Sequence, residues 1–168
     1  MYNKILTYSG MALLLVLFQV LLLDHIKLGG YINPYLYVLL ILLLPFETPK
    51  SLLLIIGFTF GLIIDIFSNT LGMHASATTF MAFLRPGVIN IISARDNIET
   101  QAQPRLANMG FDWFLKYIFF LVFAHHFFLF FIEVFTFKGF EYTLLRGTIS
   151  SLFTIVLILI SQLLIYKE

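Results

Sequence analysis

The stretch SLLLIIGFTFGLIIDIF, residues 51–67, is an apolar run that contains two glycines and a single ionisable side chain, Asp65. Crossing the hydrocarbon core of a bilayer takes about 20 apolar residues in a helix, because lipid offers the backbone no hydrogen-bond partner. The run has nearly that length. It is therefore typical of a transmembrane helix.

The composition of the whole chain has the same character. Of 168 residues, 60% are hydrophobic and 11% are charged, whereas a soluble domain carries roughly 25% charged residues. A soluble fold of this size would expose more apolar surface than water tolerates. The basic residues are scattered and the net charge is +1, which argues against a nucleic-acid partner. Absence of cysteine excludes disulfides and Cys-ligated metals. We expect an all-α integral membrane protein.

Polar breaks divide the chain into six apolar runs, which predict a six-helix bundle in one membrane domain spanning residues 1–168. The expected spans are residues 5–23, 31–46, 51–67, 71–92, 113–135 and 142–165. Between the fourth and fifth spans, residues 93–112 form a polar loop, interpreted as a solvated connector or a docking segment. The first run lacks a small-x-small cleavage site and is interpreted as an uncleaved anchor.

The second of these spans is shorter than the others. Asn33-Pro34 fits a helix cap followed by a first-turn proline, and Pro45 lies near the other end. A helix over residues 31–46 rises roughly 24 Å, against a hydrocarbon core of about 30 Å. It is either a thin span or a re-entrant segment.

Basic residues predict the orientation. With six crossings and both termini in the cytoplasm, seven Lys and Arg residues lie on the cytoplasmic side and three outside. Lys and Arg favour cytoplasmic loops. We therefore expect both termini and the loop 93–112 to be cytoplasmic.

Small side chains line one face of the third span. Gly57, Gly61, Asp65 and Ser68 fall on one helical stripe. Small residues let helices approach closely in lipid. A second stripe runs down the fourth span through Gly72, Ala75, Ser76, Thr79 and Ala82. We expect the two spans to form an antiparallel hairpin through these faces, although a face for another protein's helix would have the same pattern.

Two charged side chains lie within the third and fourth spans. An ionised carboxylate in hydrocarbon costs a few kcal/mol, so Asp65 needs a partner, and His74 is the nearest candidate. Nearby amides and water would also satisfy it, while proton handling and partner binding remain alternatives. Arg85 precedes Pro86, which predicts a kink. Arg85 is expected to snorkel to the cytoplasmic headgroups rather than to bind a substrate or pair with Asp65.

The fifth span carries three further polar residues, His125, His126 and Glu133. His126 and Glu133 are seven residues apart and share a face, whereas adjacent histidines diverge by about 100° and do not close on one ion. We expect neutral histidines hydrogen-bonded inside the bundle and no metal site, with a proton pathway as the alternative. The chain also lacks the GxSxG, Walker and HExxH motifs. A non-enzyme without a cofactor is expected.

A resemblance to a known family follows from these residues. GFTFGLIID (residues 57–65), followed by LGMHA (71–75) and LRP (84–86), resembles the rod shape-determining protein MreD family. That family shows a Gly-Leu-x-x-Asp turn and a Leu-Gly opening on the next helix. Chain length, six expected spans and a His-His pair before a Phe-rich stretch also agree. The matching motif positions are Gly61, Asp65, Leu71 and Gly72.

The resemblance implies a non-catalytic scaffold of the wall-elongation complex in the bacterial inner membrane. Members of that family bind the bitopic protein MreC and lie near the MreB filament, the glycosyltransferase RodA and an elongation-specific penicillin-binding protein. The implied fold is similar to the substrate-binding membrane subunits of vitamin transporters. A small-molecule binding or transport subunit, built around Asp65, His74, His126 and Glu133, is the alternative that the residues leave open.

Overall fold

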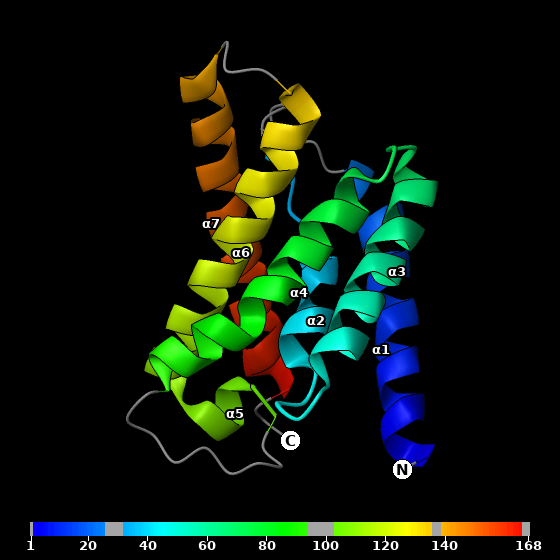
Figure 1. Ribbon diagram of the computed structural model, residues 1–168, viewed down its shortest axis with the longest axis vertical. Coiled ribbons are helices and arrows are strands. Elements are labelled where there is room, and N and C mark those ends of the chain that lie inside the picture. The colour runs from blue at the N-terminus through cyan, green and yellow to red at the C-terminus, as the bar shows by residue number, and fades with distance from the viewer. Residues whose placement is uncertain (1, 26–31, 94–102, 136–138, 166–168) are drawn as a thin grey trace.

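The computed structural model describes residues 2–25, 32–93, 103–135 and 139–165 (Figure 1). Five helices are long and apolar enough to cross a membrane. They are α1 (Tyr2–Leu21), α3 (Lys50–Ser68), α4 (Met73–Ile92), α6 (Phe111–Val134) and α7 (Phe140–Ile165). Shorter helical segments in the described parts are η1 (Leu23–His25), η2 (Leu36–Val38), α2 (Leu39–Leu43) and α5 (Leu106–Met109). Five of the expected spans are therefore confirmed as helices of sufficient length.

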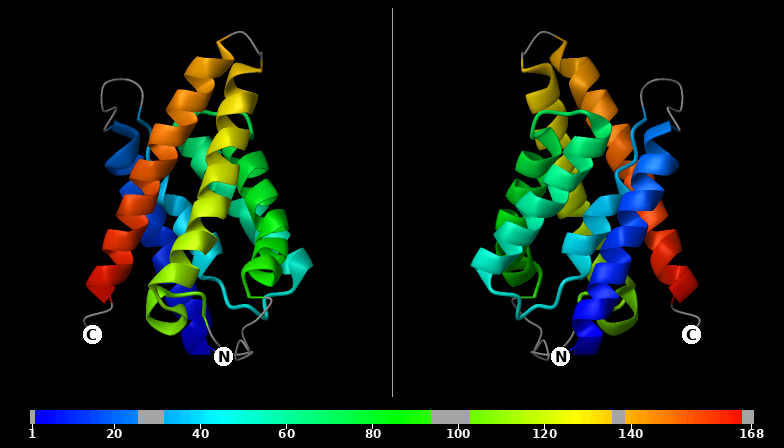
Figure 2. Two further views of the ribbon diagram at one scale, coloured as in Figure 1. Left: turned by 90° about the vertical axis from the view of Figure 1, so that its left-hand side faces the viewer. Right: turned by 90° about the vertical axis from the view of Figure 1, so that its right-hand side faces the viewer.

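The long helices form two hairpins and one separate helix. Helix α4 packs against both α3 and α6, and α6 packs against α7, while α1 lies beside η2, α2 and α3. Figure 2 shows that α1 begins and α7 ends at the same end of the bundle, which we call the terminal end. The α3–α4 turn lies at the opposite end.

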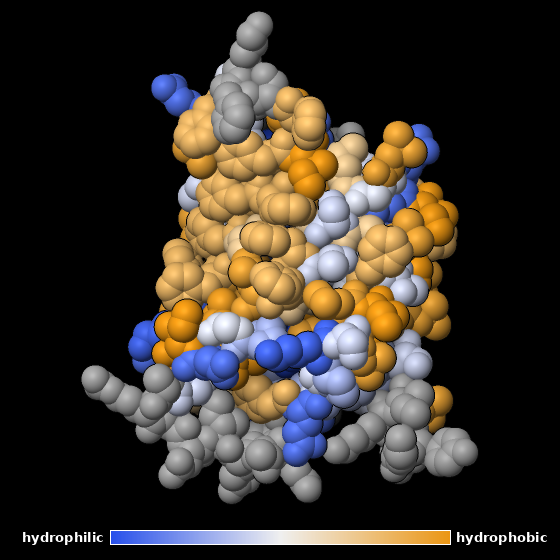
Figure 3. All heavy atoms as spheres, in the orientation of Figure 1, coloured by the Kyte–Doolittle hydropathy of each residue, from blue (hydrophilic) through white to orange (hydrophobic). Residues whose placement is uncertain are grey.

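Large apolar side chains cover the outside of the long helices. Ile55 is 61% exposed, Ile66 70% and Phe83 67%. Figure 3 shows apolar side chains over most of one face, with hydrophilic ones gathered toward the terminal end. An exposed apolar surface of this extent is stable in lipid and not in water.

The described part of the expected span at residues 31–46 contains no helix of membrane-spanning length, so the sixth expected helix is not confirmed. Its described part has no regular secondary structure at residues 33–35, followed by three residues of η2 and five of α2, which rise only about 13 Å. Leu44 ends α2 at φ −58°, ψ 146°, because a residue before proline, here Pro45, avoids the helical region.

Residues 32–44, which we call the central segment, pass through the bundle from the opposite end to the terminal end, where α3 begins (Figure 2). The segment is enclosed by protein. Tyr37, Val38, Ile41 and Leu42 are each 0% exposed. Irregular backbone at membrane depth is tolerated only where protein or a cavity surrounds it.

Side chains from α1 and α7 bond the non-helical part of the central segment. The Asn33 N–H donates to Ser150 Oγ at 3.1 Å, and the Tyr35 N–H donates to Thr154 Oγ1 at 3.1 Å. Gln19 Nε2 donates to the Pro34 carbonyl at 3.0 Å. These groups have no helical partner, so the side chains replace the bonds that a continuous helix would make.

Other side chains bond the carbonyls at the end of α2. Tyr117 OH donates to the Leu42 carbonyl at 2.9 Å, and Tyr8 OH donates to the Leu43 carbonyl at 3.2 Å. Arg85 Nη2 donates to the Leu44 carbonyl. The last carbonyls of a helix have no intrahelical partner, and here α1, α4 and α6 supply one each.

Two glycines bring α3 and α4 together. A Cβ on Gly61 would lie 2.5 Å from the His74 carbonyl oxygen and 2.6 Å from Ala75 Cα. A Cβ on Gly57 would lie 3.1 Å from Ala82 Cβ. Backbone cannot yield as a flexible side chain can, so Gly61 sets the distance between the two helices.

Replacing Thr154 by valine is expected to destabilise the protein by roughly 1–3 kcal/mol, because the part-buried Tyr35 N–H loses its acceptor and His126 Nε2 loses its donor. Reversible unfolding in mixed detergent micelles measures the change. Thr148→Val is the control, since the Thr148 hydroxyl bonds only the Leu144 carbonyl of its own helix. Equal stability of the two variants would contradict the bonding of the central segment.

Replacing Gly61 by alanine is expected to cost roughly 1–3 kcal/mol, because the added methyl group overlaps the α4 backbone. Thermal unfolding in detergent, followed by circular dichroism, tests this. Gly87→Ala is the matched control in α4, where a Cβ would meet no heavy atom within 4 Å. A Gly61→Ala protein as stable as Gly87→Ala would show that the helices are not in this contact.

Candidate functional site

Asp65 binds the beginning of α4. Its Oδ1 accepts the His74 N–H at 3.0 Å and its Oδ2 accepts the Ala75 N–H at 2.8 Å. Thr70 Oγ1 also donates to Oδ1, at 2.5 Å. The first N–H groups of a helix lack intrahelical acceptors and lie at its positive end, so a carboxylate stabilises them. Asp65 is 2% exposed, and its carboxylate accepts hydrogen bonds from backbone amides, which was one of the alternatives that the sequence left open.

The small residues of α4 divide into two groups. Ala75 and Ala82 face Gly61 and Gly57, together with the backbone of Thr78, which the expected stripe omitted. Ser76 and Thr79 instead bond carbonyls of their own helix. Gly72, the remaining member of the stripe, lies in the turn before α4 at φ 78°, and a Cβ on it would meet no heavy atom within 4 Å. Leu71, one of the motif positions, lies in the same turn and is 98% exposed.

A polar cluster lies around Tyr37 in the buried interior. Tyr37 OH lies 3.1 Å from His74 Nδ1, 3.1 Å from Thr78 Oγ1 and 2.7 Å from His125 Nε2. The ring of His74 therefore bonds Tyr37 and not Asp65, to which only its backbone is joined. His125 Nδ1 has no partner in the described structure.

His126 belongs to the same region but has other partners. Its Nδ1 lies 2.9 Å from the Val122 carbonyl and its Nε2 lies 3.0 Å from Thr154 Oγ1. A carbonyl only accepts, so Nδ1 carries the proton and Nε2 accepts from the Thr154 hydroxyl. This hydroxyl in turn accepts the Tyr35 N–H. No group of three or more metal-binding side chains occurs in the described ranges.

Arg85 does not lie on the outer surface of the bundle, as a side chain that snorkels along lipid would. Arg85 is 1% exposed, and its Nε donates to Tyr117 OH at 2.7 Å. The side chain points into the bundle because α4 lies between α3 and α6, and the broken central segment presents the Leu44 carbonyl to it. A continuous second helix would have bonded most of its own carbonyls.

Glu133 bonds Arg146 rather than sharing a site with His126. The Glu133 carboxylate lies 3.0 Å from Arg146 Nη1, and the guanidinium lies 4.3 Å from the centre of the Phe130 ring. With its amide oxygen toward Arg146, Asn33 accepts from Nη2 at 2.6 Å. Arg146 thus joins α6, α7 and the central segment.

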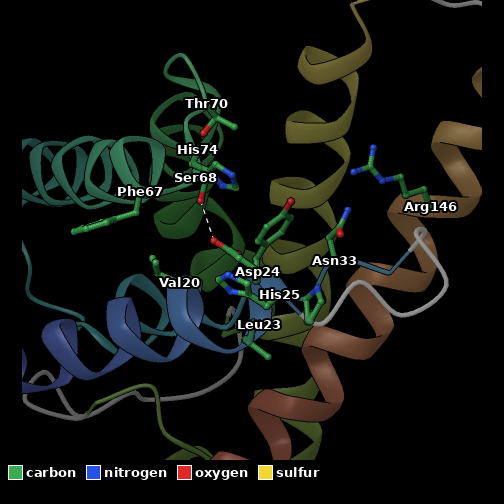
Figure 4. Close-up of a pocket in the computed structure, with 12 residues that line it drawn as sticks. Val20, Leu23, Asp24, His25, Asn33, Phe67, Ser68, Thr70, His74 and Arg146 are labelled. Carbon is green, nitrogen blue, oxygen red and sulfur yellow. Dashed lines mark hydrogen bonds between the residues drawn. The ribbon is translucent and has the colours of Figure 1, made fainter.

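A pocket of about 520 Å³ opens at the end opposite the termini (Figure 4). We call it the Asp24 pocket. Asp24 accepts from Gln19 Nε2 at 2.8 Å and from Ser68 Oγ at 2.9 Å. Figure 4 shows Arg146 and Asn33 on the other side of the pocket. Its remaining lining residues are Val20, Leu23, His25, Pro34, Tyr35, Phe67, Thr70 and His74. The mixed charges and hydroxyls suit a small polar ligand.

A second pocket, of about 450 Å³, lies at the terminal end. We call it the Arg85 pocket. It is lined by Phe46, Glu47, Thr48, Pro49, Lys50, Leu53, Arg85, Pro86, Ile89 and Asn90. Sequence reasoning missed the residues that bond the central segment, although Gln19, the one amide within the otherwise apolar run 10–23, was a usable signal.

The fold and these sites define an α-helical protein with the architecture of a multi-pass membrane protein and a polar, hydrogen-bonded interior. No family model, no curated protein and no solved structure matches the chain.

Replacing Asp65 by asparagine is expected to lower the free energy of unfolding by roughly 1–3 kcal/mol. The side-chain NH2 group would then face a backbone N–H that now donates a hydrogen bond to the carboxylate. Unfolding in mixed micelles measures it. Asp112→Asn, which removes an exposed carboxylate paired with Lys116, should change stability by less than about 0.5 kcal/mol. If both variants unfold alike, Asp65 does not hold α4.

Proposed function

We propose that this protein is a non-catalytic, MreD-like scaffold of the bacterial wall-elongation complex, in the inner membrane with both termini in the cytoplasm. The observation that carries the proposal is the motif of residues 57–65, 71–75 and 84–86. Gly61 sets the distance between α3 and α4, and Asp65 bonds the first turn of α4. Two of the motif positions thus stabilise one helical hairpin.

The arrangement of the bundle supports the same proposal. Helix α1 begins and α7 ends at the terminal end, which agrees with the even number of crossings that the expected orientation requires. The glycine face of α3, formed by Gly57 and Gly61, already packs against α4 and is not open to another protein's helix. A single-span partner of the MreC type would then bind an outer helix face, such as that of α1, where Leu13 and Leu14 are each 64% exposed.

Depletion of the protein in its rod-shaped host is expected to give round cells and dispersed wall synthesis, because the filament and the synthases lose their membrane link. Phase-contrast microscopy and fluorescent labelling of new peptidoglycan measure both. Gentle detergent purification should recover an MreC-like bitopic protein. Depleted cells that keep their rod shape and insertion pattern would refute the scaffold.

A polar-ligand binding subunit is the second candidate function, favoured by the Asp24 pocket. Of the four residues first considered for such a site, only His74 lines it. His25 also lines it and is exposed, so His25→Ala alters the pocket with little risk to folding. If the protein is a scaffold, the His25→Ala variant expressed in depleted cells is expected to restore their rod shape. Failure to restore shape, with normal protein abundance, would favour the ligand-binding function.

A further inference from the structure

Arg85 carries a buried positive charge without a carboxylate partner. The two ion pairs in the described ranges are Lys116–Asp112 and Arg146–Glu133. The bonds that Arg85 makes there go to a phenol and a carbonyl, which are neutral. An arginine within a membrane protein is costly unless an opposite charge, a dipole or water compensates it. The Arg85 pocket, which this side chain lines, is where such compensation has room.

Two further sources of positive potential border this pocket. Lys50 lines it, is exposed, and is the first residue of α3. The residue before it, Pro49, makes no side-chain cap bond to the helix. In the described part of the chain, the first N–H groups of α3 thus have no side-chain cap, and they lie at the positive end of a 19-residue helix. A buried guanidinium, an ammonium and a helix N-terminus thus border one cavity, which suits an anion with several acceptor oxygens.

The position of the pocket indicates the source of that anion. It lies where α3 begins and α4 approaches its end, at the terminal end of helices long enough to cross a bilayer. Lipid headgroups lie at this level. Phe46, Leu53 and Ile89 give the cavity an apolar part beside its charges. The one acid among its lining residues, Glu47, is exposed and weakens the positive potential without cancelling it.

We propose that the Arg85 pocket binds the phosphate group of an anionic phospholipid. Lys50 attracts the phosphate at the mouth and Arg85 supplies the inner charge, while the apolar lining contacts the glycerol and upper acyl region. This site does not depend on the wall-elongation role. A bound lipid would fix the position of α3 and α4 relative to the membrane surface.

Native mass spectrometry of the delipidated full-length protein, titrated with phosphatidylglycerol, tests the site. Lys50→Gln is expected to weaken binding about fivefold and Glu47→Gln to strengthen it about fivefold, because each changes one charge near the membrane surface. Lys116→Gln is the matched control: it removes an exposed lysine near the start of α6, outside the lining, and should leave the affinity unchanged. Phosphatidylethanolamine should bind more weakly, since its ammonium meets the basic residues.

A purely structural Arg85 would give a different result. Lys50→Gln and Glu47→Gln would then leave the phosphatidylglycerol affinity unchanged, which overturns the proposal. A parallel titration with inorganic phosphate separates the sources: binding of phosphate that depends on Lys50, without binding of the lipid, would assign a soluble anion and overturn the lipid. A carbodiimide cross-link between Lys50 and a carboxylate of a co-purified partner would replace the lipid by a protein.

Discussion

The structure depends on the hydrogen bonding of a broken chain segment inside an apolar protein. Residues 32–44 pass through the bundle with only a short helix, so several backbone groups lack helical partners. In lipid such groups cost several kcal/mol each unless they are bonded. Gln19, Tyr117 and Thr154 supply bonds from three different helices. These bonds hold the separate helix α1 and the hairpin α6–α7 around one segment.

This requirement explains four of the buried polar side chains, Gln19, Arg85, Ser150 and Thr154, which in a membrane protein would otherwise indicate transport or catalysis. Thr154 links the segment to His126, and Tyr37, itself part of the segment, links His74 to His125. Arg85 bonds the segment on one side and lines a cavity on the other. An internally bonded bundle is compatible with a scaffold, and the Asp24 and Arg85 pockets lie at opposite ends of it, within reach of ligands or lipid.

Local signals in the sequence were sufficient for the parts of the fold that depend on neighbouring residues. Five helices of spanning length follow from apolar runs, and the contact at Gly57 and Gly61 follows from their spacing on one helix face. The site was predicted less well. The sequence analysis singled out Asp65, His74, Arg85, His126 and Glu133, and it expected histidines hydrogen-bonded inside the bundle and amide partners for Asp65 as one alternative, in agreement with the structure. It named no partner for His126, and it did not predict the bonds from Arg85 to Tyr117 and from Glu133 to Arg146.

The sequence by itself determined that the chain is helical and membrane-embedded, because hydropathy and run length act through residues close together in the chain. Only the tertiary structure decided that residues 32–46 do not form a full helix, and that Arg85 is buried inside the bundle. Both outcomes depend on hydrogen bonds between residues 41 to 119 positions apart. Such pairings leave no local pattern, since each donor finds its acceptor only when the helices have assembled.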